Sequence, residues 1–451
     1  MTARLLLIAC FLLTVARSAA GTRTTDVDAI FVVIADQHSA YARTAQFVAK
    51  IDRLKADNPG IPLVVLIDGD TFELGNVIAK RSGGAIEFAM FRALARRART
   101  VLNLGNHEPE FYDLAETVAR VRATGVTVIG NLVNRATGKL FAPSSTHLKL
   151  GERDAVIAGL TTDMLAQYRA AVRPTLDLAN PVVWAKAHLP ALLATAPVKI
   201  VLSHAGLKYD REIFSVVPDG TLFAGAHDHE LFVHGMGRTV YFHSGSWNGH
   251  LSVARLRHEA GQPVWDVEQI RIGDDAPADS ELAKIISSTQ AKFATPEDLA
   301  TIGHLNAALT RTDAARMVVR AARKACGADA AFIGNTTFGD GLPTGNVSRM
   351  ALDACVRFDG TLCVAEVSGT QLRAWLATSN QGPETAFELR RDESLVADGP
   401  AAIDPEKIYR IATTDWGVRN RARYFGSEAL VFVEQPELRL KAVVTQALNS
   451  P

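Results

Sequence analysis

Short apolar runs that end in polar clusters dominate the first half of the chain. Five of them cover residues 30–34, 63–67, 101–104, 199–202 and 221–224. Continuous apolar runs of this length are typical of strands that are buried on both faces of a sheet. In open α/β sheets, ligands bind in the crevice beyond the carboxyl ends of such strands. We therefore expect the polar residues that follow the five runs to meet at one crevice.

The polar clusters consist of residue types that bind metals. They are Asp36-Gln37-His38, Asp68-Gly69-Asp70, Gly105-Asn106-His107-Glu108, Ser203-His204 and Gly225-Ala226-His227-Asp228-His229. Their side chains offer carboxylate and amide oxygens and imidazole nitrogens, without any thiolate. This composition is expected of a hydrolytic site for borderline divalent ions.

The chain of 451 residues is too long for one ordinary hydrophobic core, and its pattern divides it in two. Residues 27–273 predict a layered α/β sandwich domain, because strand-like runs alternate with helical ones at 44–54, 85–96, 113–122 and 183–193. We assign residues 274–312, which begin within an acidic, proline-containing stretch, to a linker with a helix at 280–291. Residues 313–451 predict a smaller α/β domain, with helices at 314–325 and 372–377 and strands at 330–333, 362–367, 408–412 and 430–433.

The amino terminus has the layout of a secretory signal peptide. Arg4 provides a positive charge, residues 5–15 are mostly apolar, and small residues at 18–20 precede Gly21. The apolar stretch is too short to span a bilayer comfortably. We therefore predict that residues 1–20 are removed and that the protein is exported, to a periplasm or to the outside of the cell, without stable membrane insertion.

The balance of charges narrows the range of binding partners. Lysine plus arginine and aspartate plus glutamate each number 48, so no global field favours a nucleic-acid polymer or an anionic membrane. Nothing in the sequence indicates an obligate protein partner.

Cys326, Cys355 and Cys363 remain after signal removal. One pair of them can oxidise in an exported protein, and a buried free thiol is an equal alternative for each.

The five polar clusters, in this order, resemble those of the calcineurin-like metallophosphoesterases. The resemblance implies seven ligands for two divalent metal ions: Asp36, His38 and His229 for one, Asn106, His204 and His227 for the other, and Asp70 as the bridge. A bridging carboxylate has a physical basis, because two cations ~3.5–4 Å apart repel each other strongly. Imidazole ligands favour Zn, Mn, Fe or Co over Ca or Mg and do not choose among them.

The resemblance also implies a catalytic pair next to the ligands. In the family, the histidine of Gly-Asn-His stabilises the transition state and protonates the leaving oxygen, and a nearby carboxylate orients its ring. His107 takes this role here. The related nucleotidases have an aspartate three residues later, whereas this chain has Glu110, which we assign as the partner, with Glu108 as the alternative. Asp68 is expected to support a turn rather than to bind metal, and segment 243–250 is a candidate for the rim of the site.

The second domain resembles the C-terminal domain of 5′-nucleotidases, most clearly at 326–333 and 364–372. In that family this domain stacks a base between two aromatic rings, a contact of ~1–3 kcal/mol per base in nucleic-acid systems. Phe387 matches the first ring position, and Tyr424 or Phe425 the second. Core packing is an equal explanation for each of these aromatic residues.

One segment departs from the nucleotidase pattern. Where the nucleotidases carry an arginine that holds the substrate, residues 335–343 of this chain contain no arginine and include Asp340. Loss of a charge-assisted contact weakens the binding of an anionic substrate unless another group replaces it. We expect either weaker binding or a transfer of this role to Arg390 or Arg391.

These features together predict an exported phosphomonoesterase with two divalent metal ions. It is expected to hydrolyse nucleoside monophosphates or related small phosphate esters with a water that the metals activate. The missing arginine leaves open another ester, such as a cyclic nucleotide, a nucleotide sugar or a thiosulfonate. A non-catalytic exported binding module is the alternative from a different class, and the presence of all seven ligands and His107 argues against it.

Overall fold

Two six-stranded sheets form the first domain, and the apolar runs of the sequence are their central strands. The computed structural model describes residues 27–449, and the predicted signal peptide at 1–20 lies outside the described residues. In order across the first sheet, the strands are β15 (Gln262–Arg271), β14 (His250–Glu259), β1 (Ala29–Ala35), β2 (Leu63–Asp68), β3 (Arg99–Asn103) and β4 (Thr127–Ile129). Those of the second sheet are β12 (Leu231–Met236), β13 (Thr239–Ser244), β11 (Leu222–Gly225), β10 (Val198–His204), β8 (Arg153–Thr161) and β7 (Ser145–Leu150).

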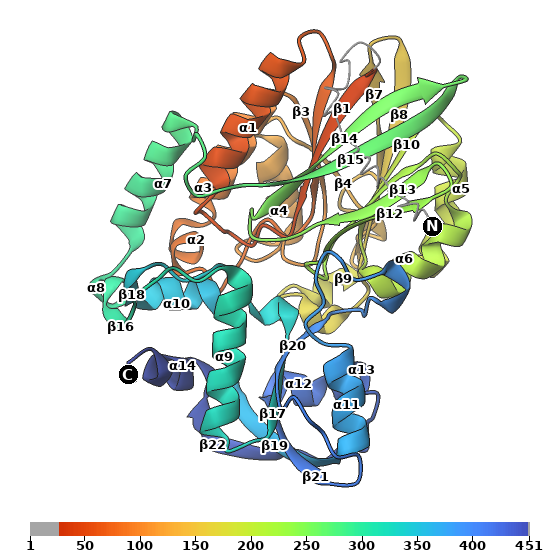
Figure 1. Ribbon diagram of the computed structural model, residues 1–451. Helices are drawn as coiled ribbons and strands as arrows, with labels where there is room; N and C mark the ends of the chain where they lie inside the picture. The colour runs from red at the N-terminus through yellow and green to blue at the C-terminus, as the bar shows by residue number, and fades with distance from the viewer. Residues whose placement is uncertain (1–26, 450–451) are drawn as a thin grey trace, which may run out of the picture.

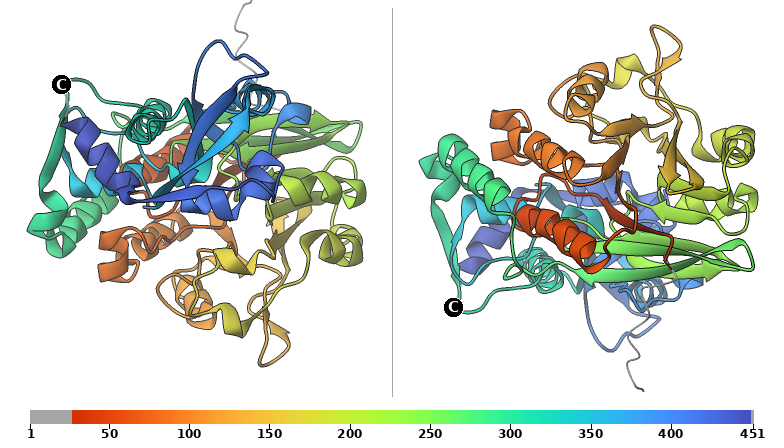
Figure 2. Two further views of the ribbon diagram at one scale, coloured as in Figure 1. Left: turned by 90° about the horizontal axis from the view of Figure 1, so that it is seen from below. Right: turned by 90° about the horizontal axis from the view of Figure 1, so that it is seen from above.

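The two sheets pack face to face, and helices cover their outer faces (Figures 1 and 2). Phe31, Leu66 and Ile200 are among the buried side chains between the sheets. The outer face of the first sheet is covered by α1 (Thr44–Asp57), α3 (Ala85–Ala95), α4 (Leu114–Arg122) and α7 (Ser280–Phe293), and that of the second sheet by α5 (Pro181–Leu193) and α6 (Leu207–Ile213). All seven residues of β1 are buried, as a strand between two such layers requires. The predicted layered α/β sandwich is confirmed.

Parallel pairing brings the polar clusters to neighbouring strand ends. In the first sheet, Ala35 of β1 lies opposite Asp68 of β2, and Asp68 lies opposite Asn103 of β3. In the second sheet, Ser203 of β10 lies opposite Gly225 of β11. Each of these residues is the last or next to last of its strand. The residues that follow therefore leave the two sheets close together.

A five-stranded sheet is the centre of the second domain, which is drawn in teal to blue below the first domain in Figure 1. Its strands, in order, are β20 (Leu395–Asp398), β17 (Ala330–Gly334), β21 (Ile408–Thr414), β19 (Thr361–Ser368) and β22 (Val433–Arg439). The surrounding helices are α9 (Arg311–Ala325), α10 (Arg349–Cys355), α11 (Gly369–Ala377), α12 (Asp415–Arg419), α13 (Arg421–Phe425) and α14 (Leu440–Leu448). The predicted strand at 430–433 is displaced, because β22 begins only at Val433.

The connection between the domains differs from the predicted linker at 274–312. The predicted helix is present as α7, but Leu282 and Ile286 are buried in the core of the first domain. After α8 (Pro296–Leu299), strand β16 (Thr301–Leu305) pairs with β18 (Gly345–Ser348) of the second domain. Most of the predicted linker therefore belongs to one domain or the other, since these elements bury side chains and pair backbone that a free linker would leave in water.

Neither disulfides nor membrane-spanning helices occur in the part of the chain that the structure describes. Cys326, Cys355 and Cys363 are all buried and none of them forms a disulfide. Within residues 27–449, every helix is too short or too polar to cross a lipid bilayer.

The packing of α7 predicts the effect of shortening its buried side chain. Leu282→Ala should lower the free energy of unfolding by about 2–5 kcal/mol, because the side chain is fully buried against the first domain. Urea unfolding followed by circular dichroism measures the change. Leu299→Ala is the matched control, because Leu299 is 57% exposed and its truncation should change stability by less than about 0.5 kcal/mol. Equal effects of the two substitutions would contradict the placement of α7 in the first core.

Candidate metal centre

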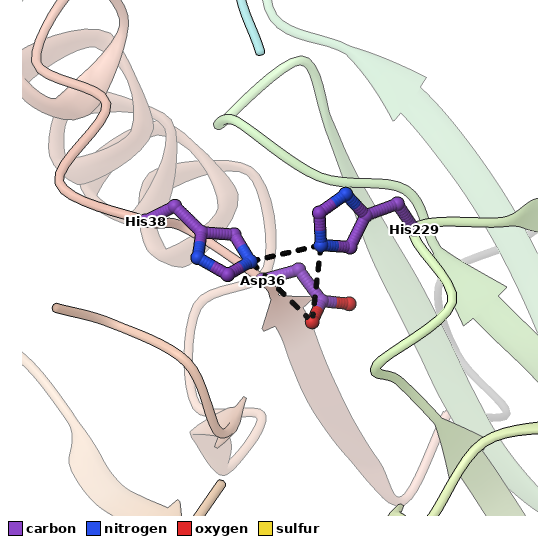
Figure 3. Close-up of side chains that lie close together, drawn as sticks. All are labelled: Asp36, His38 and His229. Atoms are coloured by element: carbon purple, nitrogen blue, oxygen red, sulfur yellow. Dashed lines mark hydrogen bonds and ion pairs between the residues drawn. The ribbon is translucent and has the colours of Figure 1, made fainter. Parts of the chain in front are cut away.

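Three of the predicted ligands form one buried cluster at the ends of the two sheets. Ligand atoms of Asp36, His38 and His229 all lie within 4.8 Å of one another. The Nε2 atoms of His38 and His229 are 2.8 Å apart, and Asp36 Oδ1 is 4.0 Å from the first and 3.9 Å from the second. Figure 3 shows the three side chains pointing toward one another, two from the loop after β1 and one from the loop after β11. Such a convergence of two imidazoles and a carboxylate suits a divalent ion.

A second cluster lies beside the first, and Asp70 connects them. Ligand atoms of Asp70, His204 and His227 also lie within 4.8 Å of one another. Asp70 Oδ2 is 3.0 Å from His204 Nε2 and 3.9 Å from His38 Nε2, so a single carboxylate oxygen faces both clusters. This is the position that a bridging ligand between two cations would occupy.

Asn106 completes the predicted set from the loop after β3. Its side chain is buried, its Nδ2 lies 3.4 Å from the carbonyl oxygen of Gln167, and its Oδ1 has no hydrogen-bond partner in the described protein. The next residue, His107, donates its backbone N–H to Asp70 Oδ1 at 2.8 Å. A buried amide oxygen without a partner is costly, and a metal ion would satisfy it.

Left-handed backbone conformations recur at the proposed ligands. The φ angles are 48° at Asp36, 46° at His38, 51° at Asp70, 82° at His227 and 58° at His229. Such conformations cost side-chain-bearing residues roughly 1–3 kcal/mol each and cluster at functional sites. The surrounding structure must therefore hold these loops in place.

Two glycines permit the close approach of the loops around Asp70. A Cβ atom on Gly105 would lie 2.3 Å from Asp70 Oδ1 and 2.9 Å from His204 Nε2. On Gly69, where φ is 70°, it would lie 2.4 Å from His204 Nδ1. Any larger residue at either position would displace the Asp70–His204 contact.

Glu108, the alternative partner of His107, has a different role. Its carboxylate accepts hydrogen bonds from the backbone N–H groups of Asp70 at 3.1 Å, Thr71 at 2.9 Å and Gly105 at 2.6 Å. These bonds join the loop after β2 to the loop after β3. Glu108 thus stabilises the backbone that carries Asp70 and Asn106. The His107 ring contacts a different carboxylate.

Asp68 orients a proposed ligand through its backbone. His204 Nδ1 donates to the carbonyl oxygen of Asp68 at 2.7 Å, which turns Nε2 toward Asp70. The Asp68 carboxylate accepts from Asn103 Nδ2 at 2.8 Å instead of facing the cluster. Contacts of this kind fix the ring orientation of metal-binding histidines.

The pKa values suit ligands that must be deprotonated. Burial lowers the pKa of His38, His227 and His229 well below the usual value, so these rings are neutral. Burial alone would raise the pKa of Asp70, but the neighbouring His204 holds it well below its usual range. His204 behaves oppositely: burial lowers its pKa, but Asp70 outweighs burial and raises it well above the usual value. A metal ion at His204 would have to displace that proton, so metal affinity should depend on pH.

His107 and Glu110 form the predicted pair. His107 Nδ1 is 3.0 Å from Glu110 Oε1. Burial lowers the pKa of His107, but Asp70 and then Glu110 outweigh burial and raise it to about 9. The ring is therefore protonated at neutral pH and can serve as a proton donor.

Three residues near the site lie outside the predicted ligands and the predicted catalytic pair. Glu73 Oε2 lies 3.4 Å from His38 Nδ1, and the Trp247 ring stacks on the His38 ring with centroids 4.8 Å apart. The guanidinium of Arg357, from the second domain, lies 4.6 Å from the centroid of the Trp247 ring. Only Trp247 falls in the segment 243–250 that the sequence indicated as a rim.

The predicted base-stacking aromatics are not available for that role in this structure. Tyr424 and Phe425 are buried in the core of the second domain, and the Tyr424 hydroxyl donates to Glu393 at 2.6 Å. The Phe387 ring packs on His234 of the first domain, with centroids 4.1 Å apart, and the Arg211 guanidinium lies 4.4 Å from its centroid. The expectation for Tyr424 and Phe425 is therefore corrected to core packing, and that for Phe387 to an interdomain contact.

The two arginines suggested as substitutes for the missing arginine already have partners. Arg390 forms a buried ion pair with Glu230 at 2.9 Å. Arg391 donates to Thr378 Oγ1 and to the carbonyl oxygens of Arg423 and Tyr424. Both guanidinium groups stabilise the protein rather than face a cavity, which corrects the expectation that one of them holds the substrate.

Two family models match the chain, one for each domain. Residues 30–231 match the calcineurin-like phosphoesterase family, and residues 289–425 match the 5′-nucleotidase C-terminal domain. The chain belongs to the calcineurin-like phosphoesterases of the 5′-nucleotidase type. It is thus a metal-dependent phosphoric ester hydrolase, and the resemblance seen in the sequence is confirmed. A comparison with curated proteins found no match.

Solved structures of the same two-domain fold span nearly the whole chain. A 5′-nucleotidase precursor from Thermus thermophilus is 16% identical, with a TM-score of 0.62 over 93% of this chain and 96% of its own. The sulfate thiohydrolase SoxB of the same organism is 14% identical, with a TM-score of 0.65 over 94% of each chain. A 5′-nucleotidase from Candida albicans is 12% identical, with a TM-score of 0.62 over 94% of this chain and 98% of its own. At these identities the likeness establishes the fold.

The contact between Glu110 and His107 predicts a change in pH dependence. Protonated His107 is the expected active form, so hydrolysis falls as the pH rises through the pKa of its ring, which Glu110 raises. Glu110→Gln removes a charge that raises this pKa, so the decline should begin at lower pH, which a pH–rate profile of kcat/KM measures. Glu116→Gln, at a carboxylate exposed on α4, is the control and should leave the profile unchanged. An unaltered alkaline limb in Glu110→Gln would contradict the pairing.

Proposed function

We propose that the protein is an exported phosphomonoesterase that uses two divalent ions and acts on a small phosphate ester, with a nucleoside monophosphate as the first candidate. The proposal rests on the position of the Asp70 carboxylate, which lies between the buried side chains of Asp36, His38 and His229 on one side and the imidazoles of His204 and His227 on the other. Support for export comes from the sequence layout of residues 1–20 alone. Zn, Mn, Fe and Co all suit the ligand set.

The side chains around Asp70 have distinct proposed tasks. Seven of them would hold the ions: Asp36, His38, Asp70, Asn106, His204, His227 and His229. When bound, the ions would orient the phosphoryl group, activate a water and stabilise the charge that develops on the phosphoryl oxygens. His107 would donate its proton to the departing oxygen of the ester, and Glu110 would hold the His107 ring in the orientation that this transfer needs.

A cavity between the domains offers space for the organic part of the ester. It measures about 800 Å³ and reaches from His229 and Trp247 of the first domain to Arg311, Arg316 and Asn335 of the second. The Arg311 guanidinium donates only to neutral oxygens, those of Asn335 and Phe338, and no ion pair joins it to a carboxylate within residues 27–449. Its positive charge is thus available for an anionic or strongly polar ligand.

The lining of the cavity favours a second candidate, an ester or thiosulfonate without a stacked base. Trp247 is the one aromatic side chain other than histidine among its described lining residues, and Phe387, Tyr424 and Phe425 all lie elsewhere. Recognition through polar contacts would suit a sugar phosphate, which carries no base. It would also suit a thiosulfonate, and one solved structure of this fold is a sulfate thiohydrolase.

A substrate panel separates these candidates. The protein, stripped of metal with a chelator, should hydrolyse nothing and should regain activity with added Mn²⁺ or Zn²⁺. A panel of 5′-nucleotides, cyclic nucleotides, nucleotide sugars, sugar phosphates and thiosulfonates then identifies the preferred class. Phosphate release from a 5′-nucleotide supports the first candidate, and turnover of another class alone supports the second. Full activity in the chelator-treated protein would contradict both.

Arg311 should determine affinity more than turnover. Arg311→Gln is expected to raise KM for the preferred substrate about tenfold or more, because a charge-assisted hydrogen bond contributes ~1.5–3 kcal/mol, with a smaller effect on kcat. Arg320→Gln is the matched control, because Arg320 is exposed on the same helix and does not line the cavity. An unchanged KM in Arg311→Gln would contradict the placement of the substrate in this cavity.

A further inference from the structure

Three acidic residues lie next to proposed ligands and face the second domain. Glu73 is three residues after Asp70, while Asp228 separates His227 from His229 and Glu230 follows His229. All three carboxylates are buried, at 1–5% exposure, and each is contacted by an arginine of the second domain. Buried carboxylates are costly unless they are paired, so these contacts matter to the loops that carry the ligands.

The contact at Glu230 is the tightest of the three. Arg390 Nη1 is 2.9 Å from Glu230 Oε2, and Ser394 donates its hydroxyl to Glu230 Oε1 at 2.9 Å. Both oxygens of the Glu230 carboxylate are therefore held by the second domain. Arg390 is itself fixed there, because its Nη2 donates to the carbonyl oxygens of Gly382 and Pro383 at 2.9 Å each.

Asp228 is held from both domains. Its Oδ2 accepts the backbone N–H of Leu207 at 2.5 Å, within the first domain. Its Oδ1 lies 3.5 Å from Arg423 Nη2, and Arg423 Nη1 is 2.8 Å from Glu393 Oε2 in the second domain. The loop from His227 to Glu230 thus has one acidic residue bound to Arg423 and another bound to Arg390.

A third contact reaches His38. Arg357 Nη2 lies 3.4 Å from Glu73 Oε2, which in turn lies 3.4 Å from His38 Nδ1. The Arg357 guanidinium also covers the Trp247 ring that stacks on His38. The second domain therefore supports ligands of both clusters, two of them through the loop that joins His227 to His229.

The loop from His227 to Glu230 needs such support. Its two histidines have φ angles of 82° and 58°, which cost free energy unless neighbouring groups hold them. Within the first domain, the backbone bonds of the loop include His227 N–H to the Asp36 carboxylate at 3.1 Å and Gly245 N–H to the Glu230 carbonyl at 2.8 Å. The arginines of the second domain supply further contacts on either side of His229.

We propose that Arg390, Arg423 and Arg357 are positioning residues of the metal centre, so that seating of the second domain and loading of the metal ions are coupled. The inference rests on the proposed function, because it takes the seven residues to be metal ligands. By thermodynamic linkage, a domain contact that raises metal affinity is itself strengthened when metal binds. Metal loading should therefore draw the two domains together.

Metal binding by an Arg390 variant tests the coupling directly. Titration calorimetry with Mn²⁺ or Zn²⁺ alone gives the dissociation constant without any substrate. In Arg390→Gln it should rise about tenfold or more, the lower end of the effect seen when a partner of a metal ligand is removed. Arg390→Lys keeps the charge and should lie between wild type and Arg390→Gln.

Arg81→Gln is the matched control. Arg81 of α2 (Val77–Ser82) forms an ion pair with Asp298 of α8, beside the second domain, and neither residue is next to a proposed ligand. This variant loosens a contact at the edge of the domain interface and should keep the wild-type dissociation constant. A loss in Arg81→Gln equal to that in Arg390→Gln would overturn the proposal, because the effect would then come from the interface in general.

A second variant and a second measurement keep the test valid if Arg390→Gln does not fold. Ser394→Ala removes one hydroxyl from Glu230 and should raise the dissociation constant by a smaller factor, about threefold or more. Small-angle scattering measures the radius of gyration of each variant. After metal addition, this radius should be smaller in the wild-type protein than in Arg390→Lys. The coupling is overturned if Ser394→Ala and Arg390→Gln both bind the metal ion with wild-type affinity. If Arg390→Gln does not fold, Arg390→Lys takes its place in this comparison. Absence of metal binding in the wild-type protein would instead overturn the proposed function and the inference with it.

Discussion

A single buried carboxylate, that of Asp70, sets the geometry of the site. It must stay ionised without water, and burial alone would raise its pKa. His204 and His107 prevent this, and two glycines without Cβ atoms let the loops approach closely enough for the contact. The parallel strands of two sheets, which end at the same edge, are what bring these residues together from distant parts of the sequence.

The second domain extends the same constraint. The ligand loops contain left-handed residues and buried acidic neighbours, and both features are unfavourable in a loop that stands alone. Arginines of the second domain form ion pairs with those acidic residues. Arg311, which lines the cavity between the domains, forms no ion pair with a carboxylate among residues 27–449. The interface between the domains thus serves both the support of the metal centre and the recognition of the ester. In this way the second domain contributes to a site that the first domain builds.

The sequence predicts the parts of the site that have a local signal. Asp36 and Asp70 each follow an apolar strand and His204 is the last residue of another, so all three lie at the carboxyl ends of strands. Arg390 and Glu230 are 160 residues apart and no pattern near either indicates the other, so their contact appears only in three dimensions. Tyr424 and Phe425 show the opposite limit. Their residue types suit both a core and a base-stacking slot, and only the packing of the second domain decides for the core.

We propose that two cations share the Asp70 carboxylate. Anomalous X-ray diffraction from crystals of the protein grown with Mn²⁺ or Zn²⁺ tests it most directly, because it locates the ions without reference to any substrate. We expect two anomalous peaks ~3.5–4 Å apart, with the Asp70 carboxylate within bonding distance of both. A single peak, or peaks out of reach of Asp70, would contradict it.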